Sequence, residues 1–190
     1  MKKSLMLATL CLGAMLSSTA NARDKAPQMT DYGYKVDAIV DGYHIDQCSP
    51  DLEGNIDMCS RTMVNKVKEI AKYPANFGKN SVLFRFWDSG LNYWVYGAVN
   101  KQTKNIFVYP RGLRAMQGNL KDVKITLGKN RDRICTAGDG VMIEGTQYSK
   151  SYDDTSNEVD YCTPYSDSEG FGQTLEVDSK TRKVIQEVWY

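Results

Sequence analysis

Residues 81–109, which read SVLFRFWDSGLNYWVYGAVNKQTKNIFVY, decide the fold of this chain. They contain three extended runs rich in aromatic and β-branched residues, at 81–87, 93–99 and 106–109, a composition typical of strands. The connections around Asp88-Ser89-Gly90 and at 100–104 are short enough for hairpins. The stretch therefore predicts a three-strand antiparallel meander.

The second connection of this meander shares a turn motif with a later segment. The segments 99–106 and 177–184 both read V-[ND]-x-x-T-[KR]-x-[IV]. An Asn or Asp at the first turn position accepts a hydrogen bond from its own backbone two residues on, and a left-handed residue then closes the hairpin. The repeat predicts the same kind of turn twice, beginning at Asn100 and at Asp178.

A helix of about residues 61–72 is predicted upstream of the meander. Ser60 is a favourable N-cap, and Pro74 ends the helix. The apolar residues of this segment fall on one stripe: Met63, Val64, Val67, Ile70 and Ala71. No other segment shows an equally clear helical pattern, so one main helix is expected.

Further extended segments complete the predicted fold. We expect strands at 32–40, 123–127, 133–136 and 141–147, and a C-terminal hairpin of 174–177 with 184–189. The fold class is therefore α+β, with one helix packed on a mostly antiparallel sheet made of the meander and the C-terminal hairpin. Residues 23–190 are expected to form a single domain.

The first 22 residues have the pattern of a cleaved signal peptide. Lys2 and Lys3 precede an apolar run from Leu5 to Leu16, and Asn21 lies between two alanines in an A-x-A cleavage site. Later stretches are too short and polar to span a bilayer. The expected location is the periplasm, with secretion as the alternative.

Four cysteines outside this segment indicate two disulfides, because an even number in an exported chain favours disulfides over free thiols. They are Cys48, Cys59, Cys135 and Cys162. Three pairings are possible, and the shortest loops favour the first cysteine with the second and the third with the fourth. No C-x-x-C motif occurs and His44 is the only histidine, so a zinc site is not expected.

The segment Asp51 to Asp57 places four oxygen donors at alternate positions between two cysteines, a pattern that invites comparison with calcium loops. Gly54 is the fourth residue of the segment, whereas a calcium loop has glycine at the sixth, and Thr62 stands where the loop needs Glu. A solvated acidic loop closed by a disulfide is favoured over a calcium site. We expect neither metal nor cofactor.

Charge and motif content argue against several function classes. The chain carries 24 Lys and Arg residues against 23 Asp and Glu, a balance that does not indicate a nucleic-acid or anionic membrane partner. His44 lies in a segment interpreted as a loop, and no Ser occupies a G-x-S-x-G motif. An enzymatic role is therefore not expected.

Two features of the sequence favour binding. Trp94 and Tyr96 share one face of the middle meander strand, and this face is either core or a binding surface. The loop 149–160, enclosed by the second predicted disulfide, contributes four acidic residues: Asp153, Asp154, Glu158 and Asp160. We expect a protein partner, such as an envelope-targeting toxin or hydrolase that this chain inhibits or neutralises. The alternative is a small ligand or an envelope component such as a glycan.

Overall fold

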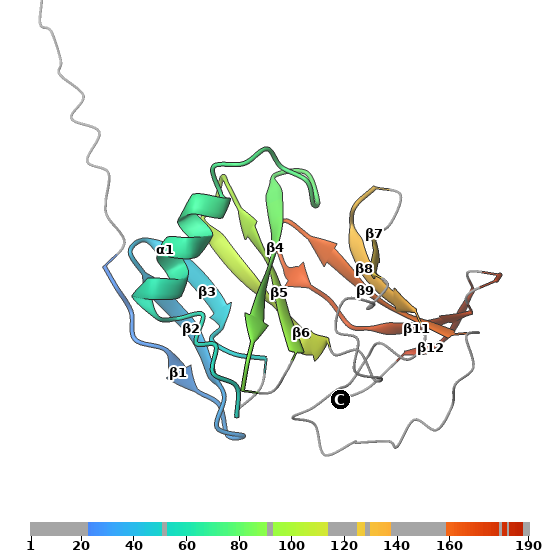
Figure 1. Ribbon diagram of the computed structural model, residues 1–190, viewed down its shortest axis with the longest axis horizontal. Helices are drawn as coiled ribbons and strands as arrows, with labels where there is room; N and C mark the ends of the chain where they lie inside the picture. Colours follow the sequence, from blue (N-terminus) through green and yellow to red (C-terminus); the bar gives the residue numbers. More distant parts are fainter. Residues whose placement is uncertain are drawn as a thin grey trace, which may run out of the picture.

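The computed structural model describes residues 23–50, 53–90, 93–113, 125–127, 130–137, 159–178, 180–181 and 183–187. These residues form one helix and two β-sheets, an α+β arrangement. In Figure 1 the helix lies beside the first strands of the chain, and the second sheet, in orange and red, lies on the other side of the molecule. No helix in these ranges is both long and apolar enough to cross a bilayer.

The first sheet is formed by the first half of the chain. Its strands are β1 (Gln28–Met29), β2 (Lys35–Val40), β3 (Tyr43–Gln47), β4 (Ser81–Asp88), β5 (Tyr93–Asn100) and β6 (Asn105–Leu113), in the order β1-β2-β3-β6-β5-β4. Neighbours pair antiparallel except β3 and β6, which are parallel. The parallel pair joins the hairpin β2-β3 to the strands β4 to β6.

The later strands form a second sheet. They are β7 (Ile125–Leu127), β8 (Arg133–Ala137), β9 (Val159–Ser166), β10 (Gly170–Phe171), β11 (Leu175–Asp178) and β12 (Val184–Glu187). Their order is β12-β11-β9-β8-β7, and β10 pairs with β9. The sequence predicted one sheet containing the C-terminal hairpin, whereas this hairpin, β11-β12, belongs to a separate sheet. The physical reason is that β5 is apolar on both faces, and its second face is covered by Ile134 of β8 and Tyr165 of β9, to which the hairpin is attached as further strands of the same sheet.

The helix α1 (Arg61–Ile70) begins where the sequence predicted. The Ser60 hydroxyl accepts a hydrogen bond from the Met63 N–H at 3.3 Å, as expected of an N-cap. The predicted end near residue 72 is two residues late, because the N–H of Lys72 already bonds to the Glu69 carbonyl in a tighter turn.

Two hydrophobic cores lie on the two faces of the first sheet. The first core combines apolar residues of α1 with the face of the sheet that includes Val82, Phe84, Val95 and Val99. The second core lies between the two sheets and consists of Phe77, Tyr96, Ala98, Phe107, Tyr109, Leu113, Ile134 and Tyr165. Alternation along each strand thus separates two apolar sets of residues.

Both predicted disulfides are confirmed. Cys48 pairs with Cys59, next to the start of α1, and Cys135 pairs with Cys162. The second pair lies in register across β8 and β9, so it links two strands already paired by main-chain hydrogen bonds. The compartment implied by such bonds is extracellular or periplasmic.

A half-buried carboxylate ties the two sheets together. Asp167 follows β9, and its Oδ2 accepts hydrogen bonds from the N–H groups of Lys79 (3.0 Å) and Asn80 (2.8 Å). Its Oδ1 accepts from the Ser81 hydroxyl at 2.5 Å, and this hydroxyl is 2.7 Å from the Tyr165 hydroxyl. Desolvation raises the pKa of Tyr165 to about 12, so the phenol stays protonated at neutral pH.

Candidate functional site

The predicted binding residues Trp94 and Tyr96 lie beside two side chains of the neighbouring strand β4. The antiparallel register places Arg85 opposite Tyr96 and Trp87 opposite Trp94. Because alternate residues share a face and opposite residues are neighbours, these four side chains lie together on the face turned toward the second sheet. We call Arg85, Trp87, Trp94 and Tyr96 the Arg85 cluster.

The members of the Arg85 cluster make specific contacts. The Arg85 guanidinium carbon lies 4.3 Å from the centroid of the Trp94 ring, within the range of a cation–π interaction. Its Nη1 donates to the Tyr96 hydroxyl at 3.3 Å. Trp87 meets Trp94 with ring centroids 5.1 Å apart. The guanidinium is therefore held over an indole, and its other N–H groups remain for water or a partner, since Arg85 forms no ion pair within the part of the chain that the structure describes.

Exposure rises across the Arg85 cluster. Tyr96 is only 5% exposed and belongs to the second core. Of the two roles considered for this face, core or binding surface, Tyr96 therefore has the core role in the isolated chain. Trp87 and Trp94 are half-buried, and Arg85 is exposed. The cluster therefore leads from a rigid core to the surface. Arg85 and Trp87 were not among the residues predicted to bind, although the alternation of β4 opposite β5 was a signal for them.

The predicted acidic residues are divided between described and undescribed parts. Asp153, Asp154 and Glu158 lie outside the described residues. Asp160 lies on β9, opposite Ala137 and Val177 in register, and is 8% exposed. The expectation of an exposed loop residue is wrong for Asp160, because β9 begins at Val159 and lies between β8 and β11.

His44 lies on a strand, not in the loop that its neighbours suggested. It belongs to β3, and its Nε2 is 2.7 Å from Asp37 Oδ1. Lys25 also contacts the Asp37 carboxylate. Hydrogen bonds from Lys25 and from His44 lower the pKa of Asp37, so the carboxylate stays ionised between two donors. The alternation of the apolar Tyr43 and Ile45 with the polar His44 and Asp46 was the missed strand signal.

Asp46, two residues after His44, is a titratable group that the sequence did not single out. Its Oδ1 accepts hydrogen bonds from the N–H groups of Gln47 (2.6 Å) and Val108 (2.9 Å). Desolvation raises the pKa of Asp46 to about 7, opposed by these two hydrogen bonds and by His44. Asp46 therefore titrates near neutral pH, in contact with β6.

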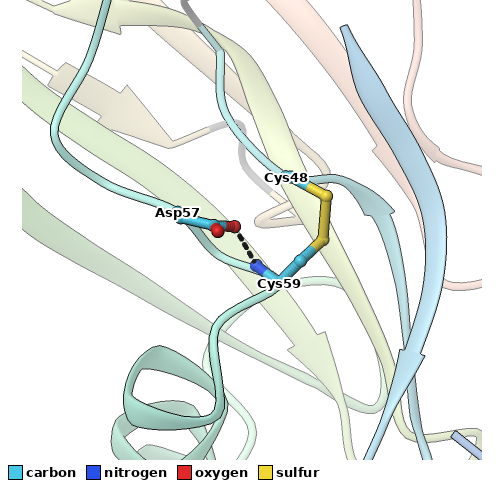
Figure 2. Close-up of side chains that lie close together, drawn as sticks. All are labelled: Cys48, Asp57 and Cys59. Atoms are coloured by element: carbon cyan, nitrogen blue, oxygen red, sulfur yellow. Dashed lines mark hydrogen bonds between the residues drawn. A yellow bond between two sulfur atoms is a disulfide. The ribbon is translucent and has the colours of Figure 1, made fainter. Parts of the chain in front are cut away.

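One group of potential metal ligands gathers within the described ranges. Cys48, Asp57 and Cys59 offer ligand atoms within 4.8 Å of one another. Figure 2 shows that the two sulfurs are joined in a disulfide and that Asp57 Oδ1 accepts a hydrogen bond from the Cys59 N–H, at 2.9 Å. The sulfurs are thus not thiolates, and the carboxylate stabilises the turn that precedes α1.

The possible role of the Arg85 cluster is inferred from the geometry of its residues. No family model, curated protein or solved structure matched the chain.

Proposed function

We propose that this chain is an exported, non-enzymatic protein-binding module of the periplasm. Its role is that of an inhibitor or immunity protein, which neutralises an envelope-targeting toxin or hydrolase by binding it. The two disulfides agree with an extracellular or periplasmic location.

The Arg85 cluster is the observation that carries this proposal. Trp, Tyr and Arg are the residues most enriched among those that dominate binding energy at protein interfaces. Here an exposed Arg85 lies over a half-buried Trp94 and donates a hydrogen bond to Tyr96, which is buried in the second core. Such preorganised side chains lose less conformational entropy on binding than free ones do.

The non-enzymatic part of the proposal is supported by how reactive groups are used. Ser81 is fully buried and hydrogen-bonded to Asp167. The described cysteines are in disulfides, and His44 contacts Asp37. These groups have structural partners and do not form a nucleophile paired with a base.

An envelope glycan or small ligand is the second candidate. The observation in its favour is that two indole rings, Trp87 and Trp94, remain half-buried and partly accessible at the same place. An apolar ring face serves a flat sugar as well as a protein side chain. The two candidates share the site and differ in what is captured.

Capture from an envelope extract tests the proposal. The bait proteins are the wild type, Arg85→Glu, which changes an exposed side chain, and Tyr32→Ala, a control aromatic that is 83% exposed on the first sheet's turn region. We expect the wild type and Tyr32→Ala to capture the same protein and Arg85→Glu to lose it at an unchanged melting temperature. The captured protein is then purified and titrated against the wild type.

Two results would contradict the protein-binding proposal. Equal capture by Arg85→Glu and the wild type would exclude the Arg85 cluster as the interface. Saturable binding of purified envelope glycan fragments that Arg85→Glu abolishes, with no captured protein, would favour the second candidate.

A further inference from the structure

The outer edge of β4 is an end of the first sheet, because β4 pairs with β5 alone. At the start of the strand, this edge is covered by the preceding segment. Ser81 and Phe77 exchange two main-chain hydrogen bonds of 3.1 Å, and the Leu83 N–H donates to Asn76 Oδ1 at 2.8 Å. The main-chain groups of Ser81 and Leu83 therefore point away from β5.

The same edge is open farther along. The register between β4 and β5 runs without a shift from Ser81 to Asp88. The main-chain groups of Arg85 and Trp87 therefore also point away from β5. Within the described ranges, neither residue's main-chain N–H donates a hydrogen bond. An open edge of this kind is a template for pairing with another strand.

The open part of the edge has a defined end. Asp88 Oδ2 accepts hydrogen bonds from the N–H groups of Asn55 (2.7 Å) and Ile56 (3.0 Å), which holds that loop at the end of β4. The open edge thus extends from Arg85 to Trp87, directly beside the Arg85 cluster.

Positive charge lies on both faces of β4 at this edge. Arg85 is exposed on the face turned toward the second sheet. Phe86 lies on the opposite face, and the exposed Lys66 has its ammonium nitrogen 5.9 Å from the centroid of that ring. Among the described residues, no carboxylate forms an ion pair with either cation. The side chains of a strand added here would alternate between the two faces of the sheet. Acidic side chains of that strand would therefore meet Arg85 on one face and Lys66 on the other.

We propose that the edge of β4 at Arg85 to Trp87 binds an extended acidic peptide segment of the partner by strand addition. Main-chain groups of Arg85 and Trp87 supply the hydrogen bonds, whereas Arg85 and Lys66 select for carboxylates. This inference rests on the proposed protein-binding function and specifies the chemistry of the segment that is bound.

The test uses a short synthetic peptide of alternating Glu and Val, with a Lys and Val peptide as its matched control. We expect the Glu peptide to shift the NMR signals of residues 84–88 and to slow hydrogen exchange at the Arg85 and Trp87 amides about tenfold. The Lys peptide should leave both unchanged. Added salt should weaken the binding of the Glu peptide, because it screens the attraction between its carboxylates and the two cations.

Main-chain pairing is tested apart from charge by comparing Arg85→Ala with Arg85→Pro. Both variants remove the guanidinium, but only proline removes the outward N–H, and an edge strand tolerates proline at such a position. We expect Arg85→Pro to bind the Glu peptide about tenfold more weakly than Arg85→Ala. This factor corresponds to the loss of one main-chain hydrogen bond.

Methylated peptides give the same information without changing the protein. Two versions of the Glu peptide are methylated on every second main-chain nitrogen, one on the odd-numbered and one on the even-numbered residues, which we call the two phases. Because a strand pairs along one edge, methylation should abolish binding in the phase whose N–H groups face β4 and leave it intact in the other. Equal binding in both phases, or no binding of the Glu peptide to the wild type, would overturn strand addition.

The outcomes separate this inference from the proposed function. A captured envelope protein that depends on Arg85 but leaves the Arg85 and Trp87 amides exchanging freely would overturn strand addition and keep the protein-binding function. Phase-dependent peptide binding by a chain that captures no envelope protein would support the edge and contradict the inhibitor assignment.

Discussion

Trp87 and Trp94 lie opposite each other across the β4–β5 pair, with ring centroids 5.1 Å apart and an interplanar angle of 64°. This is an edge-on arrangement, in which the positive edge of one ring meets the negative face of the other. The contact links the edge strand of the first sheet to β5, which contributes Tyr96 and Ala98 to the second core. The Arg85 cluster therefore depends on it for its geometry.

The first prediction concerns this ring pair. Trp94→Ala should destabilise the protein by about 1–3 kcal/mol, less than for a fully buried Trp, because the side chain is half-buried. A double-mutant cycle with Trp87→Ala should give a coupling free energy of about 0.5–1.5 kcal/mol. Urea denaturation of the four proteins measures both. Strictly additive effects would show that the rings do not stabilise each other.

The second prediction concerns Asp46 and pH. The pKa of Asp46 is raised from 3.8 to about 7 in the folded chain, so folding favours the protonated form. The stability that this group contributes is fully present below its unfolded pKa and is lost as pH rises through about 7. The loss should be on the order of 2–4 kcal/mol.

The Asp46→Asn variant isolates that effect. An amide oxygen can still accept the N–H groups of Gln47 and Val108, and it does not ionise. The variant should gain stability relative to the wild type as pH rises from about 4 to about 7, and the difference should stay constant at higher pH. The control Asp41→Asn changes a carboxyl whose pKa is lowered by Lys68, so it titrates below this window. Parallel profiles for the wild type and Asp46→Asn would contradict the raised pKa.

The third prediction compares two parts of the polar group between the sheets. Tyr165→Phe removes one hydrogen bond to Ser81 and keeps the ring, so it should cost about 1 kcal/mol. Asp167→Ala leaves the donors of Lys79, Asn80 and Ser81 without their acceptor and should cost about 3 kcal/mol or more. Thermal denaturation gives the order, and equal costs would show that the carboxylate is replaceable by water.

The fourth prediction concerns the disulfides. Intact-mass measurement should find no alkylatable thiol among Cys48, Cys59, Cys135 and Cys162 before reduction. Replacing Cys48 and Cys59 by Ser should cost about 3 kcal/mol, and replacing Cys135 and Cys162 somewhat more, because the second bond closes the longer loop, with a separation of 27 against 11 residues. The reverse order would indicate that residual structure in the unfolded chain outweighs loop entropy.

Much of the local structure was predictable because its causes lie within a few residues. The Ser60 cap and the apolar stripe after it place the start of α1. The repeated turn motif is confirmed by hydrogen bonds to Asn100 Oδ1 from Gln102 and Thr103, and to Asp178 Oδ1 from Lys180 and Thr181. Lys104 has the left-handed φ of 60° that closes the first of these turns.

The candidate site was predictable only in part. Trp94 and Tyr96 were found because they share a face of one strand, a property of that strand alone. Arg85 and Trp87 join them through the register of β4 on β5. Asp160 was misplaced in a loop, because its strand β9 is buried between β8 and β11, and polar residues there look like a solvated segment in the sequence.

The sequence by itself determined the start of the helix and the turns, and it favoured the observed pairing of the cysteines among three possible ones, because these features follow from hydrogen bonds and loop entropies between residues close in the chain. Only the tertiary structure decided that β3 runs parallel to β6, that the later strands form a second sheet over β5, and that Asp46 is desolvated. These features depend on contacts between segments that are distant in the chain. The free energy of such contacts comes from burying apolar faces, and the sequence contains several segments that could cover each face.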